Sequence, residues 1–195
     1  MPFIIMFVLC IGLLQSWLTW LAPLPNMMDL QQQHSQDFRI EIVEPYTGEF
    51  RVLATRRYPV SIMSYLLNTQ DFDRVSGLDL ALGWEQMSQP ELYKTVDIRQ
   101  SNRWYRFQVG PDTPLRVDEI SQQSANTHMV AANAVIARQL NQLDVDDLVI
   151  LKGQLIDIYA QDGRYMKTSL SRQDTGAGAC EIFLVQELSV KARTG

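Results

Sequence analysis

The 195-residue sequence predicts a strand-rich α+β protein with an apolar segment at its N-terminus. Residues 5–24 carry no charged side chain, whereas short stretches with alternating apolar and polar residues recur between residues 38 and 190. One stretch, Ala131–Leu143, has the apolar spacing of a helix with one buried face. We expect an N-terminal transmembrane helix, then a small OB-like barrel of about six strands with one packed helix. The predicted divisions are a transmembrane anchor (1–25), a polar tether (26–37), a strand-rich globular domain (38–190) and a tail (191–195).

The apolar N-terminal segment is long enough to cross a lipid bilayer as a helix. Trp17 and Trp20 stand at its far end, where aromatic rings favour the membrane interface, and Pro23 then ends the helix. A cleaved signal peptide is the alternative, but no basic residue precedes the apolar run. The first basic residue beyond the segment is Arg39. We therefore expect a single-pass protein of the bacterial inner membrane with its C-terminal domain in the periplasm.

The domain is predicted to open with a hairpin. Residues 38–43 alternate apolar and polar side chains, and Pro45–Gly48 supplies a turn into a second strand at 49–58. Residues 59–98 give mixed signals and are expected to form a long elaboration on the sheet. Within it, Leu78–Trp84 is interpreted as one helical turn or a packed loop.

The remaining elements follow in order along the chain. Pro90–Tyr93 has the features of a short helix start. Residues 103–109 again alternate as a strand, and Ser124–His128 offers capping side chains for the helix predicted at 131–143. Three further strands are expected at residues 148–159, 164–170 and 181–190.

Charge and cysteine content limit the possible functions. The chain has 17 basic and 22 acidic residues, for a net charge of −5. This acidity argues against nucleic acid as a partner, because binding to phosphates depends on positive charge. Cys10 lies in the apolar segment and Cys180 in the domain, so no internal disulfide framework is expected.

Cys180 and His128 are the only cysteine and histidine between residues 38 and 190, and such a pair is the minimum for a thiolate nucleophile. Arg172 or Arg193 would then serve as oxyanion donor. The order of anchor, histidine, cysteine and arginine is similar to that of sortase transpeptidases. Sortases, however, carry Thr-Leu-x-Thr-Cys at the end of a strand, whereas Gly178-Ala179-Cys180 begins one here. The favoured interpretation has no catalytic set, with Cys180 a small buried apolar residue and His128 at the helix entry.

Two other features of the sequence bear on chemistry: a D-T-G-A motif and a set of aspartates. Asp174-Thr175-Gly176-Ala177 matches the D-T-G-A motif of retroviral-type aspartic proteases, but the polar residues 171–173 precede it, so Gly176 is interpreted as a turn residue. His128 has no ligand spacing to the aspartates of the chain, so neither a metal nor another cofactor is expected. The aspartates considered were Asp144, Asp146, Asp147 and Asp174.

Binding to an anionic ligand or partner surface is expected at basic and aromatic residues of the predicted strand at 103–109 and at one acidic residue. These candidates are Trp104, Arg103, Arg106 and Asp174.

Three segments, Lys167–Glu181, Ser124–His128 and Asp79–Trp84, resemble those of a group of bacterial single-span membrane proteins to which no activity is attached. The resemblance implies a setting in the bacterial envelope. The predicted function is a membrane-anchored, extracytoplasmic binding or scaffold module, non-catalytic, that contacts the bilayer through residues 1–25 and a protein partner in the envelope. The first alternative is a Cys180-dependent envelope enzyme acting on peptides or thiols. The second is an OB-like nucleic-acid binder.

Overall fold

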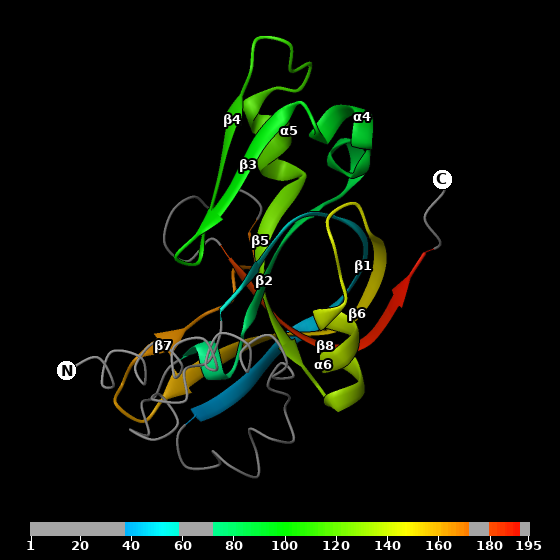
Figure 1. Ribbon diagram of the computed structural model, residues 1–195. Helices are drawn as coiled ribbons and strands as arrows, with labels where there is room; N and C mark the ends of the chain where they lie inside the picture. The colour runs from blue at the N-terminus through cyan, green and yellow to red at the C-terminus, as the bar shows by residue number, and fades with distance from the viewer. Residues whose placement is uncertain (1–37, 59–71, 172–179, 192–195) are drawn as a thin grey trace, which may run out of the picture.

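The computed structural model describes residues 38–58, 72–171 and 180–191 (Figure 1). The predicted anchor and tether (1–37) and the tail residues 192–195 lie outside these ranges. In the portion that is described, no helix combines the length and the apolar character needed to cross a membrane.

Six strands form the main sheet, in the order β1-β2-β5-β8-β6-β7. Because β1 also pairs with β6, five of them close into a barrel, and β7 adds to its side. β5 and β8 run parallel, whereas the other neighbours are antiparallel. The strand-rich α+β class and the predicted strands at 148–159 and 181–190 are confirmed. The strands are β1 (Phe38–Arg57), β2 (Leu78–Gly83), β5 (Ser124–Ala131), β6 (Leu148–Ala160), β7 (Tyr165–Met166) and β8 (Glu181–Val190).

A hairpin and short helices cover the barrel. β3 (Val96–Ser101) and β4 (Trp104–Val109) pair as a separate two-stranded sheet. Together with α4 (Pro90–Tyr93) and α5 (Val117–Gln122), this hairpin gathers at the opposite end of the barrel from α6 (Ala134–Asn141) (Figure 1). Two 3-10 turns, η1 (Phe72–Arg74) and η2 (Glu85–Ser88), flank β2. The short helix at Pro90 and the strand at 104–109 agree with the sequence analysis.

The helix predicted at 131–143 is present but shorter. Asn133 is the N-cap of this helix, because its side chain accepts hydrogen bonds from the backbone N–H groups of Val135 and Ile136. The predicted capping segment 124–128 is instead the strand β5, so His128 is not a helix-entry residue. The buried side chains of Ile136 and Leu140 close the barrel interior.

The predicted hairpin at 38–58 is wrong, because β1 continues through Pro45–Gly48 as one strand. Its partner β6 pairs with it from Phe38 to Arg51, with one bulge between Ile42 and Glu44, and the turn residues Pro45–Gly48 pair in regular register with Gly153 and its neighbours. Turn propensity is therefore overridden by the hydrogen bonds of the neighbouring strand.

The segment interpreted as a helical turn or loop is β2, and every one of its residues is buried. Leu78, Leu80 and Leu82 face the barrel interior, whereas Ala81 packs in a second core beneath the β3–β4 hairpin. A strand covered on both faces shows no alternation, which explains the wrong interpretation. The strand predicted at 164–170 shortens to the two residues of β7.

Gly153 marks the closest approach between two barrel strands. The pairing of β6 with β8 shifts register between Lys152 and Gly153. A Cβ atom added at Gly153 would lie 1.9 Å from the carbonyl oxygen of Leu184. Only glycine leaves room for this backbone, so barrel closure depends on it.

We expect Gly153→Ala to lower the free energy of unfolding by about 1–3 kcal/mol or more, because two backbones would have to separate. Urea unfolding of the full-length chain in mild detergent measures this change. Gly110→Ala is the matched control, since the nearest atom to its added Cβ lies 3.8 Å away. Equal stability of the two variants would contradict the role of Gly153 in closure.

Candidate functional site

A buried carboxylate and an imidazole face each other across two strands. Asp79 on β2 and His128 on β5 are direct register partners, so their side chains lie on the same face of the sheet. The Oδ1 atom of Asp79 lies 2.7 Å from Nδ1 of His128. Both side chains are buried, at 1% and 6% exposure. A hydrogen bond at this position fixes the orientation of the imidazole ring.

Cys180 joins this pair through the parallel pairing of β5 with β8. Thr127 pairs with Glu181, which places Cys180 beside Asn126 at the start of β8. The Nδ2 atom of Asn126 lies 3.6 Å from the sulfur of Cys180. Cys180 is also close enough to His128 to contribute to the electrostatics of its ring. Cysteine, histidine and aspartate are thus grouped at three adjacent strands, with a hydrogen bond joining His128 to Asp79.

The surroundings of His128 favour its protonated form. Burial acts to lower the pKa of His128, but the hydrogen bond to Asp79 and the proximity of Cys180 outweigh it and raise the pKa from 6.5 to about 9. The ring therefore carries a positive charge at neutral pH.

Arg103, at the tip of the β3–β4 hairpin, connects the hairpin to Asp79 and to the residues before β2. Its guanidinium donates to Asp79 at 2.8 Å and also to Asp73 and the carbonyl of Ser76. The guanidinium also stacks on the ring of Tyr58, 4.3 Å from its centroid. The backbone carbonyl of Arg103 approaches Cys180 at 3.9 Å. Arg103, predicted as a ligand-binding residue, thus contacts other parts of the protein instead.

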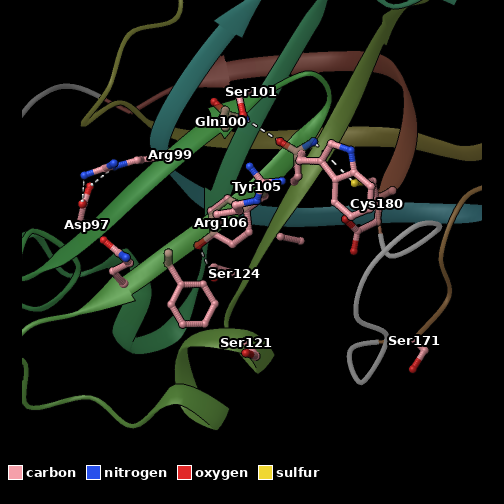
Figure 2. A pocket seen from close by; sticks show the side chains of 16 residues that line it. Asp97, Arg99, Gln100, Ser101, Tyr105, Arg106, Ser121, Ser124, Ser171 and Cys180 are labelled. Atoms are coloured by element: carbon pink, nitrogen blue, oxygen red, sulfur yellow. Dashed lines mark hydrogen bonds and ion pairs between the residues drawn. The ribbon is translucent and has the colours of Figure 1, made fainter.

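Cys180 opens onto a cavity of about 1040 Å³ between the β3–β4 hairpin and the start of β5 (Figure 2). Asn126, Trp104 and Arg106 also line it. Trp104 is 41% exposed, and Arg106 makes no hydrogen bond or ion pair with any residue that the structure describes. In Figure 2, Cys180 lies at one end of the cavity and the ion pair of Arg99 with Asp97 at the other. Trp104 and Arg106 therefore remain candidates for binding.

The other predicted site residues are separated from this cluster. Arg172 and Asp174 lie outside the described ranges, as do Arg193 and the D-T-G-A motif. Asp146 bonds to Tyr93 and Lys94, not to His128. Among the residues with described positions, no group of three or more acidic, histidine or cysteine side chains is arranged to hold a metal ion.

Cys180 is partly exposed and contacts the polar groups of Asn126 and Arg103, so its interpretation as a buried apolar residue is wrong. The sequence analysis missed Asp79 and Asn126 as members of the site. One signal was available: Asp79 is a charged residue inside the apolar run Leu78–Leu82, and buried charges require partners.

No protein-family model and no curated protein matches the chain. A solved structure that does match is the crystal structure of the small single-stranded DNA-binding protein from Streptomyces coelicolor, with 9% identity and a TM-score of 0.35. The match covers 80% of this chain and 99% of the other. Because this neighbour is a single-stranded DNA-binding protein, the prediction against nucleic acid as a partner is withdrawn. At this TM-score the match carries no argument about what this chain binds.

The raised pKa of His128 predicts a pH-dependent stability. A group whose pKa is higher in the folded state stabilises fully below its unfolded value of 6.5, and this contribution disappears as the pH rises through about 9. We expect a loss on the order of 3 kcal/mol over this range, at about 1.4 kcal/mol per unit of pKa. Urea unfolding at closely spaced pH values measures it.

His128→Gln should flatten this pH dependence, because the titrating group is removed. His34→Gln removes the other histidine of the chain and should leave the dependence unchanged. If the two variants show the same pH profile as the unmodified chain, His128 is not the group that carries the effect.

Proposed function

We propose that the chain is a thiol-dependent enzyme that transfers or hydrolyses acyl groups, with Cys180 as nucleophile. The single observation that carries this proposal is the grouping of Cys180 with the hydrogen-bonded pair of His128 and Asp79, on adjacent strands at the end of an open cavity. A nucleophile beside a base, with the base oriented by a third group, is the common requirement of covalent catalysis. A non-catalytic envelope module remains a prediction, although its function would need none of these contacts.

In the proposed first step, the thiolate of Cys180 attacks the acyl carbon of the substrate. A carbon–sulfur bond forms and the carbonyl electron pair moves onto oxygen; the carbonyl then re-forms as the bond to the leaving group breaks. The imidazolium of His128 donates its proton to the leaving group. The products are a thioester on Cys180, a neutral His128 and a free amine, alcohol or thiol.

In the proposed second step, neutral His128 accepts a proton from water or from an acceptor amine. The oxygen or nitrogen then attacks the thioester carbon, the carbon–sulfur bond breaks, and the thiolate of Cys180 returns beside a protonated ring. Asp79 keeps the ring oriented through both steps by its hydrogen bond to Nδ1.

The barrel supports this function by holding three strands in fixed register. The closed strand order, with one helix between β5 and β6, supports an OB-like barrel. The sequence of residues 1–25 supports an envelope setting, where peptides are the expected acyl substrates. The cavity is large enough for an extended substrate to reach Cys180.

The full-length chain carrying Cys10→Ser tests the proposal, because Cys180 is then its only thiol. We expect para-nitrophenyl acetate to form an acetyl adduct on Cys180 that intact-mass spectrometry detects. At pH 7, His128→Gln should slow alkylation of Cys180 by iodoacetamide about tenfold or more, since less thiolate is present.

Ser121→Ala is the matched control for this experiment, because it removes a hydroxyl from the lining of the same cavity and leaves Cys180, His128 and Asp79 unchanged. It should react at the unmodified rate. Absence of an acetyl adduct, or an alkylation rate that does not depend on His128, would overturn the proposal.

Trp104→Ala and Arg106→Ala should weaken binding of substrate without changing the thiol itself. We expect KM for a turned-over ester or peptide to rise about tenfold, while alkylation by the small reagent iodoacetamide stays unchanged. Steady-state kinetics with both variants measures this difference. If KM stays unchanged in both variants, this part of the cavity does not contact the substrate.

A further inference from the structure

We infer that Asn126 is the oxyanion donor for Cys180 and that Gln100 is the positioning residue that aims it. This inference rests on the proposed function, because an oxyanion forms only if Cys180 attacks a carbonyl group. It assigns the charge-stabilising role to a residue of β5, whereas the sequence predicted Arg172 or Arg193 for that role.

The surroundings of Asn126 determine which end of its amide faces the sulfur. Its Nδ2 atom is surrounded by three acceptors: the sulfur of Cys180 at 3.6 Å, the carbonyl oxygen of Arg103 at 3.4 Å and Oδ2 of Asp79 at 3.5 Å. An amide oxygen at this position would face only acceptors, so the nitrogen must occupy it. Asn126 is 3% exposed, which restricts its movement.

Gln100 on β3 holds the opposite end of the same amide. Its Nε2 atom donates to Oδ1 of Asn126 at 2.6 Å, a short bond that keeps the Asn126 nitrogen directed at Cys180 (Figure 2). The other amide atom of Gln100, Oε1, is buried and makes no hydrogen bond with any residue that the structure describes. This orientation of Gln100 leaves one acceptor unsatisfied but maintains its bond to Oδ1 of Asn126. The Nδ2 atom of Asn126 therefore stays directed at the sulfur of Cys180.

The three contacts of Nδ2 are long for hydrogen bonds, so its donor capacity is incompletely used in the resting protein. When the sulfur attacks, the carbonyl electron pair moves onto oxygen, two bonds from the sulfur. A donor 3.6 Å from the sulfur is close enough to reach that oxygen. Asn126 would then stabilise the charge that develops in the transition state more than the uncharged substrate.

Two reagents separate this role from a structural one. Acetylation by para-nitrophenyl acetate passes through an oxyanion, whereas alkylation by iodoacetamide takes place at a saturated carbon and forms none. In full-length Cys10→Ser protein, we expect Asn126→Ala to slow acetylation about 10²- to 10³-fold. Alkylation should stay within about threefold, because it does not use the oxyanion donor.

A second variant changes the orientation of the Asn126 amide without removing the amide. Gln100→Glu replaces a donor by a carboxylate, which accepts hydrogen bonds and would draw Nδ2 of Asn126 away from the sulfur. Acetylation should slow about as much as in Asn126→Ala, again with little change in alkylation. Gln108→Glu adds the same charge to the lining of the same cavity on β4 and should leave both rates unchanged.

The outcomes distinguish failure of the proposed function from failure of the inference about Asn126 and Gln100. If the Cys10→Ser protein is not acetylated at all, the proposed function fails. If it is acetylated and Asn126→Ala reacts equally fast, or if acetylation and alkylation slow together, the inference about Asn126 is overturned while Cys180 remains the nucleophile. Acetylation in Gln100→Glu as fast as in Gln108→Glu would overturn the positioning role of Gln100.

Discussion

The buried carboxylate of Asp79 constrains the structure around it, because its charge needs partners. Its side chain is 1% exposed, so these partners lie within the protein. One partner, His128, comes from the adjacent strand, and the other, Arg103, comes from the tip of the β3–β4 hairpin. Arg103 and its neighbour Asn102 adopt left-handed backbone conformations, with φ of 64° and 50°. This tight turn, unfavourable for arginine, brings the guanidinium to Asp79.

The same carboxylate connects stability to the proposed chemistry. By accepting a hydrogen bond from His128, it fixes the ring and favours its positive charge. By accepting from Arg103, it positions the hairpin whose backbone carbonyl contacts both Cys180 and Asn126. A substitution at Asp79 would therefore affect folding and reactivity together, which is why Cys180, His128 and Asn126 are better positions for testing function.

Local patterns in the sequence predict the isolated elements of this fold but not its connections. β6, β8 and the helix α6 are recognised because each has one buried face or a clear apolar run. β2 is missed because both of its faces are covered, and β1 is split because its turn residues lie within a long ladder. Cys180 and His128 were recognised as a possible pair. The sequence marks Asp79 as a buried charge that needs a partner, but its contact with His128 depends on the pairing of β2 with β5. The contact of Asn126 with Cys180 depends on the parallel pairing of β5 with β8.

The central claim is that Asp79, His128 and Cys180 form one coupled unit with a protonated ring. Nuclear magnetic resonance of the full-length chain labelled with ¹⁵N-histidine tests it directly, with His34→Gln used to assign the two signals. The account predicts that the His128 ring nitrogens titrate near pH 9, and that this midpoint falls when Cys180 is replaced by alanine. A midpoint at or below the ordinary value of 6.5, unchanged by loss of Cys180, would contradict the account.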